Sequence, residues 1–109
     1  MTDSITHTAF FGIAEQIFTL TDPMIAELER TADVGIGALY QRAIAMQFRA
    51  ADLTEIIRLG LIGGGTNPQA AMQLTDTYAT NRPMAETYPL VLDILDARWN
   101  GNTEESEAA

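Results

Sequence analysis

The sequence predicts a mainly α-helical fold: a compact five-helix domain that follows a short N-terminal β-hairpin, with an α+β arrangement as the alternative. Three observations point to this fold. After residue 21, apolar residues recur at helical spacing over most of the chain. Glycine, proline and capping residues separate these stretches at short intervals. Before residue 21, aromatic and β-branched residues alternate with polar ones, as in strands.

The first element is a hairpin, predicted from two β-prone stretches near residues 6–11 and 16–21. Gly12 interrupts the run of aromatic and β-branched residues between them. An isolated hairpin is only marginally stable in water. We therefore expect it to lie on the helices.

The next two helices are set by a cap and by periodicity. Thr21 and Asp22 followed by Pro23 are typical of a helix start, and the helix should end near Asp33. A second helix is predicted from Ile36 to Phe48, because its apolar positions keep i, i+3, i+4 spacing over three turns.

A third helix is predicted to begin at Asp52, which forms a capping-box pattern with Glu55. Leu53, Ile56 and Ile57 share its apolar face with Leu61. Gly60 lies on the same face and costs stability inside a helix. We interpret this glycine as a point of close approach by another helix.

The last two helices are predicted from Pro68 to about Thr80 and from Pro83 to Trp99. Proline suits the first turn of a helix, where an amide hydrogen has no partner. Pro89 lies inside the fifth helix, so the helix should kink or restart there.

A sharp turn is predicted between the third and fourth helices. Gly63, Gly64 and Gly65 follow a helical run, and glycine adopts the positive φ common after helix ends. Asn67 offers an N-cap oxygen and Pro68 a first helical residue. An anion-binding nest is the alternative, but no strand precedes the glycines and the phosphate-loop lysine is absent.

These elements define the expected domain organisation. Residues 1–101 form one helical domain, with the hairpin over about 6–21 and the helices over 22–100. Residues 102–109 are small and acidic, and we expect a disordered tail.

The composition argues against several classes of partner. The formal net charge is −9 and all six basic residues are scattered arginines. Nucleic acids and anionic membranes both require a basic surface, so we expect neither. The apolar runs are too short to span a bilayer, and the N-terminus does not resemble a signal peptide. The absence of cysteine rules out disulfides but does not fix the compartment, and the simplest expectation is a cytoplasmic protein.

Catalytic and metal-binding groups are sparse, and we expect neither an enzyme nor a metal or cofactor site. The only histidine, His7, lies in a polar stretch and is interpreted as a solvated surface residue. Asp93 and Asp96 share a helix face, but no further ligand accompanies them. Solvated helix faces explain the acids.

Aromatic residues and methionines are the remaining candidates for function. Their spacing is typical of a core, but an exposed apolar groove for a partner is the alternative, because flexible thioethers suit variable apolar surfaces. The residues predicted to contact a partner are Phe48, Leu61, Ile62, Met72, Tyr88 and Trp99.

Three segments together resemble a known family. Ala26–Arg42, Asp52–Gly65 and Arg82–Leu95 are similar to the small tail proteins of gene transfer agents and related prophages. The most specific part is the run from Arg58 through the three glycines. The family is catalogued as a phage tail assembly chaperone and also as a tail tube protein.

The resemblance implies a role in building a phage-like tail. A tail assembly chaperone would bind the tape measure protein, or other tail proteins, in the cytoplasm during assembly. The alternative is a structural subunit of the tail, such as a tube or terminator component, which would be virion-associated. Homo-oligomerisation is left open.

Overall fold

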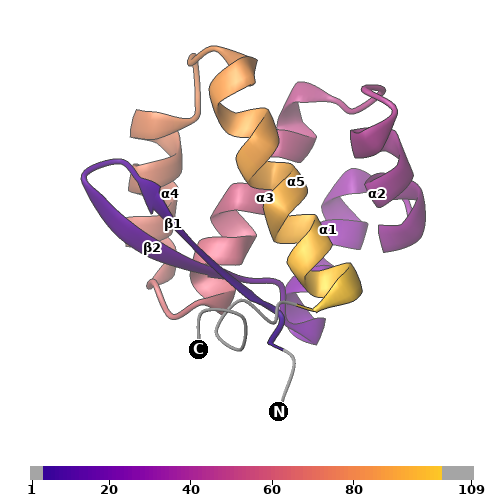
Figure 1. Ribbon diagram of the computed structural model, residues 1–109, viewed down its shortest axis with the longest axis horizontal. Helices are drawn as coiled ribbons and strands as arrows, with labels where there is room; N and C mark the ends of the chain where they lie inside the picture. The colour runs from indigo at the N-terminus through magenta and orange to yellow at the C-terminus, as the bar shows by residue number, and fades with distance from the viewer. Residues whose placement is uncertain (1–3, 102–109) are drawn as a thin grey trace, which may run out of the picture.

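The computed structural model describes residues 4–101 and confirms the mainly α-helical fold with an N-terminal hairpin (Figure 1). The strands are β1 (Thr6–Phe11) and β2 (Ala14–Thr19). The helices are α1 (Asp22–Ala32), α2 (Ile36–Ile44), α3 (Ala50–Gly63), α4 (Pro68–Tyr78) and α5 (Met84–Asn100). The predicted acidic tail, 102–109, lies outside the described residues.

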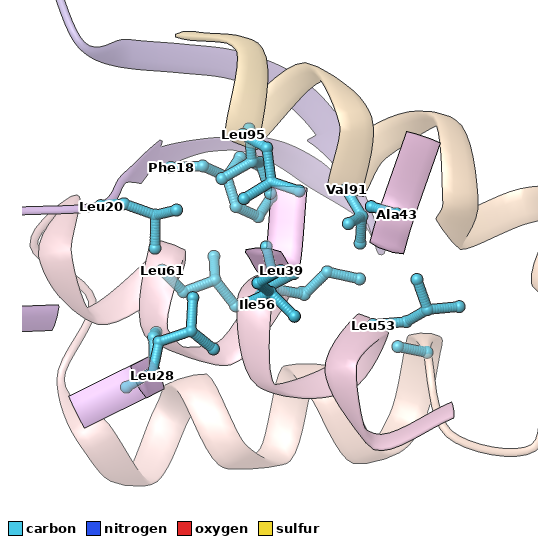
Figure 2. Packing of buried hydrophobic residues seen from close by; sticks show 14 of the residues in the cluster. Phe18, Leu20, Leu28, Leu39, Ala43, Leu53, Ile56, Leu61, Val91 and Leu95 are labelled. Atoms are coloured by element: carbon cyan, nitrogen blue, oxygen red, sulfur yellow. The ribbon is translucent and has the colours of Figure 1, made fainter. Parts of the chain in front are cut away.

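Helix α3 is the centre of the molecule. It contacts α1, α4, α5 and β2, and its apolar residues are buried on nearly every side. Figure 2 shows Ile56 and Leu61 of α3 among side chains from the surrounding elements. The predicted apolar face is buried as expected, and Leu59, outside that face, is buried too. The remaining side, which carries Thr54, Glu55 and Arg58, is partly exposed.

The hairpin has a two-residue loop, Gly12-Ile13, because Phe11 pairs directly with Ala14. Gly12 has a φ of 77°, as the first position of a tight hairpin turn often requires. The second strand therefore begins two residues earlier than predicted. Phe11 and Phe18 face the helices and are buried, which anchors the hairpin on the core.

Gly60 marks a close approach, but a strand lies nearest to it. A Cβ atom at Gly60 would lie 3.4 Å from the Cβ of Phe18 and 3.6 Å from the Cγ2 of Ile94. Phe18 belongs to β2 and Ile94 to α5. The prediction of a second helix at this point is thus incomplete, since β2 crosses α3 there as well.

The three glycines after α3 serve two different purposes. A Cβ at Gly63 would lie 1.8 Å from the carbonyl oxygen of Thr19, and one at Gly64 would lie 2.0 Å from that of Ile17. Gly64 has a φ of −83°, so the positive-φ explanation is wrong there. It holds for Gly65, whose φ is 113°. The first two glycines admit the backbone of β2, and the third allows the turn.

Helix α4 starts as the sequence pattern predicts. The Oδ1 atom of Asn67 accepts a hydrogen bond from the amide of Ala70 at 2.8 Å, and Pro68 is the first helical residue. The helix ends at Tyr78, two residues before the predicted end.

Helix α2 ends at Ile44, four residues before the predicted end at Phe48. Met46 adopts a φ of 60°, and the amide of Gln47 donates to the carbonyl of Arg42 at 2.8 Å. This left-handed residue closes the helix in the way a glycine often does. Phe48 consequently lies in the connection to α3.

Helix α3 begins at Ala50, and the predicted N-cap at Asp52 is wrong. Asp52 is the third helical residue, and its Oδ2 accepts from the amide of Arg49 at 2.8 Å and from Nη2 of Arg42 at 2.7 Å. Glu55 pairs instead with Arg58, at 2.8 Å. The buried Asp52 carboxylate therefore joins α2 to α3.

Helix α5 is continuous from Met84 to Asn100 and runs through Pro89 without a restart. Pro89 removes the hydrogen bond that the carbonyl of Ala85 would accept. Both residues are exposed, so water can hydrate that carbonyl. This exposure explains why the helix does not restart at Pro89, which was one of the two predicted alternatives.

Candidate partner-binding surface

Aromatic side chains line the contact between α2 and α5. Tyr40 stacks on Trp99, with ring centroids 5.1 Å apart, and Phe48 stacks on Tyr88, with centroids 5.2 Å apart. Ile44 lies one helical turn after Tyr40, on the same face of α2. We call these five residues the α2–α5 seam.

Hydrogen bonds fix the orientation of the two tyrosines. The hydroxyl of Tyr88 donates to the carbonyl oxygen of Ala43 at 2.7 Å, and that of Tyr40 donates to Oδ1 of Asp96 at 3.2 Å. Burial raises the pKa of Tyr40 above its usual range, and the hydrogen bond to Asp96 acts in the same direction. The seam is a preorganised surface.

The seam leaves large apolar side chains open to solvent. Trp99 is 58% exposed and Ile44 is 55% exposed. Met46 follows at the end of α2 and is 66% exposed. Contiguous exposed apolar groups often mark interaction sites, and tryptophan and tyrosine are enriched at interface hot spots.

Of the six residues predicted to contact a partner, the structure joins two directly, since Phe48 stacks on Tyr88, whereas Trp99 stacks on Tyr40 about three helical turns further along α5. Phe48, Tyr88 and Trp99 all belong to the seam. Leu61 is fully buried in the core and Ile62 is partly buried, so a partner could reach Leu61 only if helices separated. Met72 is 52% exposed, but it lies on α4, on the opposite side of the molecule from α2 (Figure 1).

Sequence reasoning did not single out Ile44 as a surface residue, although its side chain is 55% exposed. Tyr40, by contrast, is half-buried and packs against the core. Helix α2 ends at Ile44, so no further turn of this helix follows that side chain. The left-handed conformation of Met46 ends the helix. No residue type that favours turns marks this position in the sequence.

A second apolar area lies on the hairpin. Phe10 is 70% exposed, Ile13 is 80% exposed and Ile17 is 49% exposed. They lie on the outer face and at the loop, and the loop contacts α4, since a Cβ atom at Gly12 would lie 2.8 Å from the ring of Tyr78. Figure 1 places the hairpin beside α4 and away from α2.

His7 is not the solvated residue expected from the sequence. Its side chain is only 16% exposed and lies between Phe18, with ring centroids 6.5 Å apart, and Asp93, whose Oδ2 is 3.7 Å from Nε2. The alternation of the strand turns this side chain toward the helices.

Carboxylates remain available on the surface, whereas arginines are mostly paired. Every arginine of residues 4–101 except Arg49 forms an ion pair. Asp93 is 60% exposed, and Asp96 is also exposed beside the seam. The surface therefore favours a partner with basic residues.

Within 4–101, no three His, Cys, Asp or Glu side chains are grouped so that they could hold a metal ion. No helix in that range is long and apolar enough to cross a membrane.

The fold defines a small, mainly α-helical protein with an N-terminal hairpin, and comparison with known families places it further. Residues 4–101 match the family described as "Phage tail tube protein, GTA-gp10". The chain belongs to this family and is thus a phage tail-related protein, as the resemblance noted in the sequence implied. Neither curated proteins nor solved structures gave a match.

Proposed function

We propose that this protein is a tail assembly chaperone that binds the tape measure protein without performing chemistry. One observation carries the proposal: the α2–α5 seam exposes Trp99 and Ile44 beside two fixed tyrosines. An amphipathic helix of the client would lay its apolar face on such a surface. The complex would form in the cell that produces the particles.

The charge of the chain supports this role. A net charge of −9 would keep a client covered by many copies soluble. Weak contacts repeated along a long client gain strength through multivalency. No single seam therefore needs high affinity.

Co-expression with the tape measure protein tests the proposal. We expect the wild-type chain to keep the client soluble and the double variant Ile44→Ser, Trp99→Ser to fail, with little loss of its own stability because both side chains are exposed. Met72→Ser is the matched control, since Met72 is similarly exposed on α4. Equal effects of the seam and control variants, or a client whose solubility never changes, would count against the chaperone role.

A structural subunit of the tail is the second candidate, and the family description, which names a tail tube protein, favours it. Purified particles distinguish the two roles. A structural subunit would be present in stoichiometric amounts, whereas a chaperone would be absent from mature particles.

A further inference from the structure

The outer edge of β1 has unpaired backbone groups. Phe11 and Ala14 close the two-residue loop, so they form a hydrogen-bonded pair, and the antiparallel pattern makes Ala9 and Gln16 the next such pair. The amides and carbonyls of Thr8 and Phe10 must then point away from β2. No hydrogen bond to these groups exists within residues 4–101, and both residues are exposed.

The corresponding edge of β2 is covered. The carbonyl oxygens of Ile17 and Thr19 point away from β1, onto Gly64 and Gly63 at the end of α3. This contact independently confirms which pairs of the ladder are hydrogen-bonded. Helix α3 thus blocks strand addition at β2, and only the β1 edge is open.

The β1 edge lacks the features that usually protect edge strands. Its sequence, THTAFF, contains no lysine and no proline, and its register with β2 is regular, without a bulge. Phe10 adds an apolar side chain on the outer face, where an added strand could pack against it. An open edge of this kind is suited to main-chain recognition.

The surrounding charge selects the partner. Helix α5 contacts β1, and Asp93 on α5 lies beside His7 with its side chain 60% exposed. Glu15 pairs with Phe10 on the outer face. A second copy of this chain would bring like charges together at this edge, whereas a strand with basic side chains would meet opposite charges.

We propose that the β1 edge binds an extended segment of a partner polypeptide in which apolar and basic residues alternate. The segment adds a third strand to the hairpin through the backbone groups of Thr8 and Phe10, and its apolar residues cover Phe10. This surface is separate from the α2–α5 seam, so the proposal goes beyond the chaperone role and does not depend on it.

Amide hydrogen exchange on the full chain tests this proposal. The probe is a short peptide of alternating valine and lysine with blocked ends, and a valine–glutamate peptide is its charge-reversed control. We expect the lysine peptide to slow exchange at Thr8 and Phe10 in a dose-dependent way. Ala9 is the internal reference, because its amide is already bonded within the hairpin.

Variants at position 8 sharpen the test. Thr8→Pro removes the outward amide, which the hairpin does not use, and proline is tolerated on strand edges. It should weaken peptide binding by about tenfold, the factor expected for one backbone hydrogen bond. Thr8→Val keeps the amide and should bind as the wild type does. Asp93→Asn should weaken the lysine peptide alone.

Three results would overturn the proposal. One is unchanged exchange at Thr8 and Phe10 in the wild-type chain with excess lysine peptide, which decides the matter even if Thr8→Pro does not fold. Another is equal protection by the glutamate peptide. The third is protection that grows with protein concentration in the absence of peptide, since it would show that a second copy occupies the edge.

Discussion

The two exposed apolar regions of this molecule are built differently. The α2–α5 seam consists of side chains that stack in pairs and are held by the hydroxyls of Tyr40 and Tyr88. The hairpin has exposed side chains without such support, but it adds an open backbone edge at Thr8 and Phe10. The seam is thus suited to side-chain recognition of a helix, and the hairpin to main-chain recognition of a strand.

The largest expected effect concerns the attachment of the hairpin to α3. Gly64→Ala places a methyl group where the Ile17 carbonyl lies, so β2 must move away from α3. We expect a loss of about 3 kcal/mol or more in the free energy of unfolding, at or above the upper end usual for overpacking. Denaturant unfolding measures it.

Gly37→Ala is the matched control for this substitution. Gly37 lies in α2, and a Cβ there would contact nothing within 4 Å. We expect no loss and a gain of up to about 1 kcal/mol from helix propensity. Similar destabilisation by both alanines would show that the β2 contact does not explain Gly64.

The next effect concerns the buried ion pair between Asp52 of α3 and Arg42 of α2, which holds α2 in place beside the seam. Asp52 is 4% exposed and pairs with Arg42, whose side chain is 18% exposed. Asp52→Asn leaves that guanidinium without its counter-charge, and we expect a loss of about 3 kcal/mol, measured by chemical unfolding. Asp22→Asn, which breaks the exposed pair with Arg98, should cost no more than about 1 kcal/mol. If the two variants lost equal stability, the buried pair would not be what holds α2 to α3.

The smallest effect is a pH dependence at the seam. The folded protein raises the pKa of Tyr40, chiefly through burial and also through Asp96. The neutral phenol is therefore favoured in the native state. This contribution to stability is fully present below the unfolded pKa of about 10 and declines as the pH rises through and above it.

Tyr40→Phe removes that pH dependence. We expect the stability difference between the wild type and this variant to change from about pH 9 to about pH 11, with the wild type losing more. Unfolding curves at a series of pH values measure it. Parallel curves over this range would mean that the fold does not perturb Tyr40.

Local patterns predicted most of the fold but not its junctions. Caps such as Thr21 and Asn67 located helix starts, because their hydrogen bonds lie within a few residues of sequence. The end of α2 was predicted wrongly because Met46 adopts a left-handed conformation, which methionine does not favour. Asp52 was misplaced because its main partner, Arg42, lies on another helix.

The candidate surface was only partly predictable, for a similar reason. Phe48, Tyr88 and Trp99 were recognised by residue type, but whether an aromatic residue is exposed depends on the packing of whole helices. Leu61 illustrates this, since it is fully buried in a helix surrounded on nearly every side. The open edge of β1 could not be inferred at all, because it depends on α3 covering β2.

The contact of β2 with Gly63 and Gly64 has a consequence for synthesis. The hairpin is synthesised before the helices on which it rests, and its contact with Gly63 and Gly64 at the end of α3 lies about 45 residues later in the chain. Until α3 has emerged from the ribosome and formed a helix, both edges of the hairpin are uncovered. The hairpin can therefore dock on α3 only after translation has passed Gly63 and Gly64. It reaches its final position late, although it is synthesised before the helices.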